Sequence, residues 1–361
     1  MKFTYKLRIK ANLRITNVKT IRKFVEMVFV TGGTGLLGTH VLYELLKSGK
    51  QVRALKRPGS DLLQVIRTFS YYTSAPEQLF SKVQWVEGDL DDIYSLLEAM
   101  EGVDEVYHCA AIVSFDPKDV QAILKVNIEG TTNVVNAAIE KKIKKFCHVS
   151  SIAAIGTSEG SITEETYWKS SPDNSIYSIS KYGAEREVWR AAEEGLNVVV
   201  VNPSVIIGPG DWKGVGTKMF RTAYNGLLFY TDGVTGFVDA RDVAGVMVRL
   251  MESKICGQRF IVSSENIGFR KFFELACACF KKPLPSVKAG ALLSGIAWRI
   301  EKFKSAISGY SPLITKETAR AAHKTKYYSN DKVKKALNYN FIPVDESIRE
   351  TCRLFLLDTK N

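Results

Sequence analysis

The sequence predicts an α/β fold with a doubly wound parallel sheet. Two observations lead to this prediction: apolar runs of strand length alternate with stretches of helical pattern, and a glycine-rich turn directly follows the first apolar run. This alternation is typical of βαβ units, whose right-handed crossovers give the strand order 3-2-1-4-5-6. Strands are expected at Met27 to Val30, Gln51 to Leu55, Val83 to Val86, Glu105 to His108, Lys145 to Val149 and Asn197 to Val201.

The turn after the first strand is a candidate phosphate-binding loop. It reads Thr-Gly-Gly-Thr-Gly-Leu-Leu-Gly from Thr31 to Gly38. Its glycines permit a tight turn and close approach of the backbone to a pyrophosphate, while the helix that follows offers unpaired N–H groups. Because similar spacings occur in turns without a ligand, this motif alone is weak. The cofactor contacts expected here are Gly32, Thr34, Gly35, Leu36, Leu37 and Gly38.

A second motif predicts acid/base chemistry. Tyr177 and Lys181 stand four residues apart on a predicted helix that runs to about Glu194, so they share one helix face. A phenol titrates near pH 10, and a neighbouring ammonium group lowers that pKa by stabilising the phenolate. Ser150 and Ser151 end the preceding apolar strand, where their hydroxyl groups would face a ligand. An accidental Tyr and Lys on a helix surface is the alternative for this spacing taken alone.

From Val28 to about Phe355 the chain resembles an extended short-chain dehydrogenase/reductase. Its nearest branch is the dihydroflavonol 4-reductase and 3-beta-hydroxysteroid dehydrogenase-like one, on the residues His108 to Phe115 and the short span from Gly208 to Asp239. The resemblance implies a Rossmann fold with a smaller C-terminal α/β substrate lobe. The further matching segments are Trp85 to Leu90, Val106 to Ala111, Val126 to Thr131, Asn202 to Pro209 and Phe237 to Val243.

The resemblance also implies a role for each matching residue. Tyr177 would be the general acid/base, and Lys181 would bind the nicotinamide ribose and lower the tyrosine pKa. Ser151 would hydrogen-bond the substrate oxygen, and it is preferred to its neighbour because it lies five residues before Gly156. Asn127 would support a water path to Lys181. The remaining cofactor contacts would be Asp89, Leu90, Cys109, Ala110, Ala111, Pro203, Ser204 and Val205.

The choice between NADP(H) and NAD(H) depends on the charge after the second strand. In NAD-selective sites an acidic residue about 20 positions beyond the glycines accepts the ribose 2′-hydroxyl, whereas an Arg accommodates a 2′-phosphate. Here Lys56 and Arg57 follow the strand, and no carboxylate occurs before Asp61. NADP(H) is therefore favoured. NAD(H) is possible if the two basic residues are an ordinary solvated pair.

Three parts are expected in this chain of 361 residues. Residues 1–26 would form a basic extension and residues 27–208 the Rossmann dinucleotide-binding domain. Residues 209–361 would form mainly the substrate lobe, with 237–262 returning to the Rossmann core. An apolar helix from Ala289 to Ile300 would cover an apolar substrate or simply complete the lobe. Residues that would line a pocket, or alternatively pack in the core, are Trp212, Met219, Tyr224, Phe229 and Tyr230.

The basic excess of the chain lies mainly in its first segment. Residues 1–26 hold eight basic side chains and one acidic one, which is +7 of the net charge of +12. We expect Met27 to be the natural start and the segment before it to have no folded role. It lacks the apolar core of a signal peptide and the serines of a transit peptide. The alternative is that this segment is an arm that binds nucleic acid or anionic lipid. Charge alone carries little specificity, so we expect no nucleic-acid partner.

The composition also indicates where the protein is located and whether it binds a metal. No apolar stretch reaches about 18 residues, so no membrane span is expected and a cytoplasmic location is the default. The six cysteines are scattered through apolar segments, as in a reducing compartment, and the four histidines have no metal-ligand spacing. No metal site is therefore expected.

Three functions remain open from the sequence. The first is an oxidoreductase that interconverts a carbonyl and a secondary alcohol of a small, partly apolar substrate with net cofactor turnover. The second is a nucleotide-sugar epimerase that recycles tightly bound NAD, for which Lys213, Lys218 and Arg221 offer few basic residues. The third is a non-catalytic cofactor-sensing protein, against which the intact serine, tyrosine and lysine argue. Dehydration is disfavoured because Ile152 occupies the position where a dehydratase would have an acid.

A homodimer is expected by analogy with extended members of this superfamily. It would form through two helices at about Val120 to Glu140 and Tyr177 to Glu194. The candidate contacts are Ile123, Val134, Val188 and Trp189, although the same residues could face the sheet.

Overall fold

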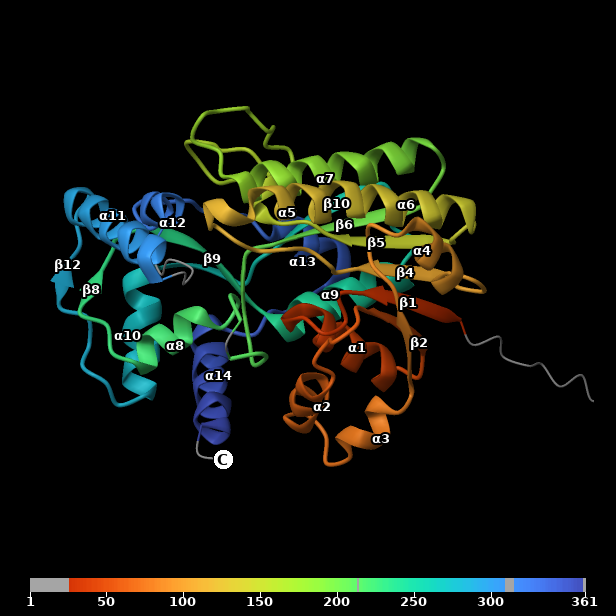
Figure 1. Cartoon of the computed structure of the whole chain (residues 1–361), viewed down its shortest axis with the longest axis horizontal. Coiled ribbons are helices and arrows are strands. Elements are labelled where there is room, and N and C mark those ends of the chain that lie inside the picture. The colour runs from red at the N-terminus through yellow and green to blue at the C-terminus, as the bar shows by residue number, and fades with distance from the viewer. Residues whose placement is uncertain (1–25, 213, 309–314, 360–361) are drawn as a thin grey trace, which may run out of the picture.

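A seven-stranded parallel sheet forms the centre of the computed structural model, which describes residues 26–212, 214–308 and 315–359 (Figure 1). The strand order is β10-β6-β5-β4-β1-β2-β3, and every neighbouring pair is parallel. The strands are β1 (Met27–Thr31), β2 (Gln51–Lys56), β3 (Val83–Glu87), β4 (Glu105–His108), β5 (Lys145–Val149), β6 (Val198–Pro203) and β10 (Gln258–Val262). The expected fold class and the order of the first six strands are confirmed, and β10 adds a strand beside β6.

Helices cover both faces of this sheet (Figure 1). Because side chains alternate along a strand, β1 sends Val28 and Val30 into one apolar core and Phe29 into the other. The first core lies under α1 (Leu36–Lys47), α2 (Leu63–Ser70), α3 (Pro76–Phe80), α9 (Ala240–Glu252) and α13 (Asp331–Leu337). The second face carries α4 (Ile93–Ala99), α5 (Val120–Leu124), α6 (Gly130–Glu140) and α7 (Ile176–Glu193). Burial on both faces explains why β1 and β6 contain continuous apolar runs in the sequence.

Most of the side chains proposed for a dimer contact are buried within the single chain. Val134 and Val188 belong to the core between the sheet and the helices α6 and α7, and Ile123 is buried on α5. The alternative expectation, that these side chains pack inside the chain, therefore holds for Ile123, Val134 and Val188. The homodimer stays a prediction.

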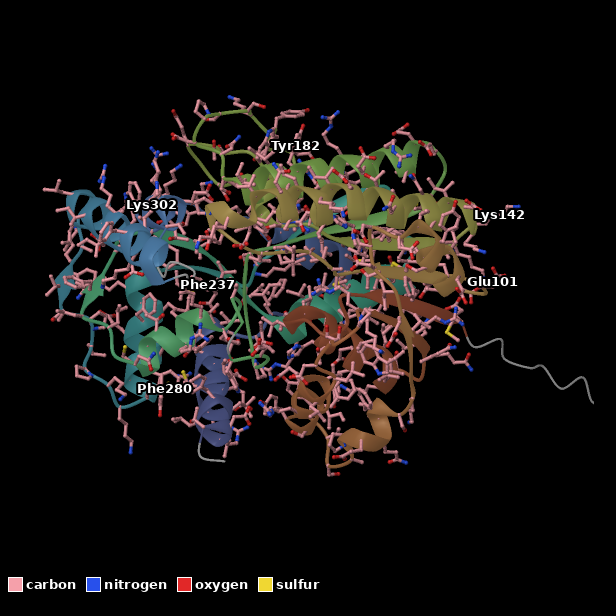
Figure 2. The ribbon with its side chains drawn as sticks, viewed as in Figure 1. Glu101, Lys142, Tyr182, Phe237, Phe280 and Lys302 are labelled. Atoms are coloured by element: carbon pink, nitrogen blue, oxygen red, sulfur yellow. The ribbon has the colours of Figure 1, made fainter. Side chains whose placement is uncertain are left out.

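The smaller lobe has its own sheet and an aromatic core. The strands β7 (Val205–Ile207), β9 (Val234–Asp239) and β11 (Glu265–Gly268) form one sheet, and β8 (Phe229–Tyr230) pairs with β12 (Val287–Lys288). Its helices are α8 (Lys218–Tyr224), α10 (Phe269–Cys279), α11 (Ala291–Ser308), α12 (Lys316–Ala321) and α14 (Val344–Asp358). The core includes Phe237 and Phe280, which Figure 2 labels. Trp212, Met219 and Tyr224 pack against this core, so the core-packing alternative holds for them.

Two elements from residues 237–262 lie with the main sheet, because α9 packs on α1 and β10 pairs with β6. Of the basic extension only Glu26 is described, and its carboxylate pairs with Lys50 at 2.6 Å. Residues 1–25 lie outside the described residues. Within the described ranges, none of the helices combines the length and the apolar content needed to cross a bilayer.

Two buried histidines lie side by side between the sheet and α6 and α7. The rings of His108 on β4 and His148 on β5 are stacked with centroids 5.3 Å apart. Thr131 Oγ1 donates to the Asn127 carbonyl, so it accepts from His108 Nε2 at 3.0 Å, and Thr31 Oγ1 donates to His108 Nδ1 at 2.7 Å. The ring nitrogens of His148 have no partner among the described residues. Burial lowers the pKa of His108 to about 3 and also lowers that of His148.

Because these two histidines are buried with lowered pKa values, we expect the free energy of unfolding to fall in mild acid. The unfolded chain takes up a proton on each histidine below about pH 6.5 and the folded chain does not, which costs about 1.4 kcal/mol per pH unit for each. His148→Leu removes one such proton without removing a described hydrogen bond. Its free energy of unfolding, measured with urea at about pH 7.5 and about pH 5.5, should therefore fall less steeply than that of the unsubstituted chain.

His323→Gln is the matched control, because His323 is only partly buried and its ring reaches Ser294 Oγ. It should keep the slope of the unsubstituted chain. A His148→Leu variant with an unchanged slope would contradict the prediction.

Candidate active site

The glycine loop packs tightly against the end of β4. Gly32 has a φ of +71°, and a Cβ there would lie 2.6 Å from the Ala110 nitrogen. A Cβ at Gly38 would lie 2.0 Å from the Gly32 carbonyl oxygen, so α1 can approach the loop only because a glycine stands there. Gly35 caps α1, and no side chain in the described part of the chain bonds the N–H groups of the first helical turn. Those amide groups and the positive end of the helix dipole suit an anionic ligand.

Other predicted cofactor contacts lie around this loop. The amide groups of Cys109 and Ala110 donate to the Thr31 carbonyl and hydroxyl oxygens at 3.2 and 3.3 Å, which holds this segment and Ala111 beside the loop. Leu37 is buried beneath the loop. Leu36 extends the other way, because Cβ atoms at Gly210 and Gly216 would lie 2.8 and 2.9 Å from its side chain. The stretch after β7 therefore lies against the start of α1.

The contacts expected at the other strand ends are more varied. Leu90 is buried against α6, and its carbonyl accepts from Asn133 Nδ2 at 2.8 Å. Asp89 and Ser95 are joined through the Asp89 backbone. Ser204, between Pro203 and Val205, is tied to β10 by a backbone bond of 3.0 Å to Val262. These residues lie at or just after the carboxyl ends of β3 and β6.

Lys56 and Arg57 differ in their surroundings. The Lys56 ammonium forms an ion pair with Glu87 across the ends of β2 and β3. The Arg57 guanidinium is exposed and has no hydrogen bond or ion pair among the described residues, while its backbone N–H donates to Ser60. Arg57 is therefore the basic residue of this pair that has its charge available.

Ser151, Tyr177 and Lys181 meet beyond the end of β5. Ser151 lies just after the strand, and Tyr177 is the second residue of α7, so the Ser151 hydroxyl is close enough to the phenol to lower its pKa. Lys181 is buried one helical turn further on, and its Nζ donates to the Val149 carbonyl at 2.7 Å. The Phe115 ring stands edge-on to the Tyr177 ring with centroids 5.6 Å apart. A phenol, a hydroxyl and an ammonium group thus gather at the carboxyl edge of the sheet.

Burial dominates the proton affinities of this group. It raises the pKa of Tyr177, and the nearby Ser151 hydroxyl acts in the opposite direction. Burial lowers the pKa of Lys181 to about 8, and the negative charge of Glu185 partly offsets that effect. In this arrangement the tyrosine pKa therefore lies above its ordinary value. Its lowering by Lys181 stays a prediction.

Asn127 joins two segments of the site. It lies in a π-helical turn, Lys125–Glu129, a form of helix that is frequent at functional sites. Its amide bonds both backbone groups of Ile112, at 2.7 and 3.0 Å, and donates to Ser180 Oγ at 2.9 Å. The residue beside Lys181 is thereby connected to the segment after β4. The water path proposed for Asn127 stays a prediction.

A buried carboxylate, which the sequence analysis did not single out, lies at the base of this group. Glu185 is one turn beyond Lys181 on α7 and accepts from Ser150 Oγ at 2.5 Å and from Asn202 Nδ2 at 2.8 Å. Asn202 also donates to the Ser151 carbonyl at 3.0 Å. The sequence signal for Glu185 is its position four residues after Lys181, which places it on the same helix face. Ser150 donates to Glu185, whereas the Ser151 hydroxyl acts on the pKa of Tyr177, so the two serines have different surroundings.

Glu185 also has a positive partner from the edge of the sheet. Arg259 on β10 places Nη1 3.2 Å from its carboxylate, and Trp189 Nε1 donates to it at 3.2 Å. Arg259 in turn donates to the Glu164 carbonyl at 2.9 Å. A buried ion pair of this kind needs such additional hydrogen bonds to offset the loss of solvation.

Known proteins resemble this chain in both sequence and fold. Residues 28–263 match the model of the NAD dependent epimerase/dehydratase family. A Synechocystis protein named "Putative dihydroflavonol 4-reductase" is 31% identical over 342 residues, which are 91% of this chain and 94% of that protein. Sterol demethylase protein B of Methylococcus capsulatus is 34% identical over 241 residues, 66% of this chain and 69% of that protein. The crystal structure of gox2253 is 29% identical with a TM-score of 0.76, covering 92% of this chain and 98% of that one.

The family match covers the glycine loop, the serine, the tyrosine and the lysine. The first of these relatives covers nearly the whole chain, so the likeness includes the smaller lobe. The chain therefore belongs to the NAD dependent epimerase/dehydratase family and is an enzyme of the extended short-chain dehydrogenase/reductase type.

Proposed function

We propose that the chain interconverts a carbonyl group and a secondary alcohol on a small, partly apolar substrate, with Tyr177 as the acid/base. The observation that carries the proposal is the gathering of Ser151, Tyr177 and the ammonium group of Lys181 at the carboxyl edge of the sheet. The buried Lys181 lies one helical turn away. The name of the Synechocystis relative, a reductase, supports the same class of reaction.

The glycine loop and the strand ends around it would hold the nicotinamide cofactor. The close contacts of Gly32 and Gly38 with backbone atoms leave no room for side chains, and the uncapped amides of α1 suit a pyrophosphate. The bound cofactor would supply or accept the hydride. The protein's part is to orient the substrate and to move a proton.

Each residue of the group would act at one atom. The Ser151 hydroxyl would hold the substrate oxygen beside Tyr177, whose phenol gives or takes the proton on that oxygen. Lys181, fixed by the Val149 carbonyl, would keep a positive charge near the phenolate. Asn202 fixes the Ser151 backbone. The ring of Phe115 beside Tyr177 presents an apolar surface, which favours an apolar group on the substrate.

NADP(H) is the cofactor that the charges at β2 favour. Lys56 already pairs with Glu87, so the 2′-phosphate would be held mainly by the exposed Arg57 guanidinium. An Arg at this position is the feature that accommodates a 2′-phosphate in Rossmann folds.

Removal of the phenol hydroxyl should abolish most of the turnover. We expect Tyr177→Phe to lower kcat by about 10²–10⁴-fold, the usual contribution of a positioned acid/base, and to leave NADPH affinity nearly unchanged. The assay is reduction of a panel of dihydroflavonols and sterol ketones, followed by the absorbance of reduced nicotinamide. Tyr182→Phe is the control, because Tyr182 is on the same helix but stacks on Trp168 (Figure 2).

Two outcomes would contradict the proposal. Turnover retained by Tyr177→Phe would assign the proton transfer elsewhere or favour a cofactor-sensing protein. Purified protein that carries bound NAD and converts nucleotide sugars without a net absorbance change would be an epimerase.

Loss of the exposed guanidinium should change cofactor preference. Arg57→Ala removes a charge-assisted contact to the 2′-phosphate, so the KM for NADPH should rise about tenfold while that for NADH stays within about twofold. Arg67→Ala, on the neighbouring helix α2, is the control and should change neither constant. An equal change in both KM values would show that Arg57 does not bind the 2′-phosphate.

Neutralising the buried carboxylate should move the alkaline limit of activity. Glu185 raises the pKa of Lys181, so Glu185→Gln should deprotonate Lys181 at a lower pH and shift the fall of kcat/KM toward lower pH. Glu187→Gln is the control, since Glu187 pairs with Arg190 on the same helix. A uniform loss of activity at every pH would indicate a structural role only.

A further inference from the structure

The helix α11 carries a continuous apolar stripe on its outer side. Leu293, Ile296, Ile300 and Phe303 recur every three or four residues and Leu292 precedes them, so all five lie within an arc of about 100° on one helix face. All five are exposed: Leu292 by 82%, Phe303 by 69%, Ile300 by 50%, Ile296 by 49% and Leu293 by 39%. Scattered exposed apolar residues are ordinary, but a continuous stripe of this kind marks an interaction surface.

The opposite side of α11 is attached to the lobe. The helix packs on α12, and Ser294 Oγ lies 2.9 Å from His323 Nε2. In Figure 1 the helix lies at the outer end of the lobe, far from β1 and β2 of the main sheet, and Figure 2 labels Lys302 on it. The stripe is therefore held in a fixed orientation toward solvent.

Positive charge borders the stripe. At about 100° per residue, Arg299 lies at one edge of the apolar arc and Lys304 at the other, and Lys302 lies beyond Arg299. All three side chains are exposed. Residues 281–304 contain six basic side chains and one acidic one. An apolar arc with cationic borders is the pattern of a helix that lies in the plane of a membrane interface.

We propose that α11 docks the protein on an anionic lipid surface. The five apolar side chains would enter the boundary between headgroups and acyl chains, and the basic side chains would meet the lipid phosphates. This is surface docking and not a span. A second copy of the chain is disfavoured as the occupant, because a two-fold contact would bring the two basic segments together. The proposal does not depend on the catalytic one.

Vesicle sedimentation tests the proposal with the full chain. The probe is vesicles of phosphatidylcholine with about 30% phosphatidylserine, compared with vesicles of pure phosphatidylcholine. The double variant Leu292→Gln, Phe303→Gln should bind the anionic vesicles at least tenfold more weakly than the unsubstituted chain. The matched control is Leu63→Gln, Tyr94→Gln, which removes two equally exposed apolar residues from α2 and α4 and should bind normally.

A second variant separates the charge from the apolar contact. Arg299→Gln, Lys302→Gln should weaken binding to the anionic vesicles and leave the lower binding to pure phosphatidylcholine unchanged. Because every variant has the same basic residues 1–26, that segment cannot produce a difference between them. Circular dichroism should show equal helix content in all variants.

The results that would overturn the proposal are specific. Equal vesicle binding by the α11 variant and the control variant would exclude α11 as the docking element. A conversion of dimers to monomers by Leu292→Gln, Phe303→Gln, measured by light scattering, would identify a second copy as the occupant. Equal affinity for the two kinds of vesicle would reject the anionic lipid.

Discussion

The buried ammonium of Lys181 is the charge around which the site is organised. A buried cation is stable only where other groups offset its lost hydration. Here the Val149 carbonyl accepts from Lys181, and the negative charge of Glu185 raises the lysine pKa. Glu185 in turn requires donors, which come from the end of β5, from β6 and from β10. The position of α7 over the sheet is thereby linked to the position of three strand ends.

This network connects the edge of the sheet to the reacting group. Arg259 is on the edge strand β10, yet its guanidinium reaches the same carboxylate that holds Asn202, and Asn202 holds the Ser151 backbone. The Glu185 carboxylate accepts from four donors, and hydrogen bonds are strong in a low-dielectric interior. The consequence is a fixed position for the Ser151 backbone near Tyr177. The same logic applies at the glycine loop, where His108 joins Thr31 to the π-helical turn that contains Asn127.

The sheet could be predicted from sequence because inner strands such as β1 and β6 are buried on both faces and therefore contain uninterrupted apolar runs. β10 is harder to find, since Gln258 and Arg259 begin it and only Phe260 to Val262 are apolar. The spacing of Tyr177 and Lys181 can be recognised in the sequence because a phenol and an ammonium group on one helix face form an acid/base pair. Glu185 has the same spacing, but a glutamate on a helix is usually a surface residue, and only its donors from three distant strands reveal its burial.

The smaller lobe was predicted in outline only, because its sheet joins segments far apart in the chain. β9 pairs with β7 and with β11, and neither pairing has a local signal such as a tight turn. Its core is nevertheless complete: Phe237, Phe272, Phe280 and Phe355 pack together with side chains from α8, α10 and α14. Among the described residues, α11 contributes no side chain to that core, so its exposed apolar stripe is not part of the packing that stabilises the lobe. An apolar face that folding does not use needs another reason to be there, and its basic borders indicate contact with a negatively charged surface.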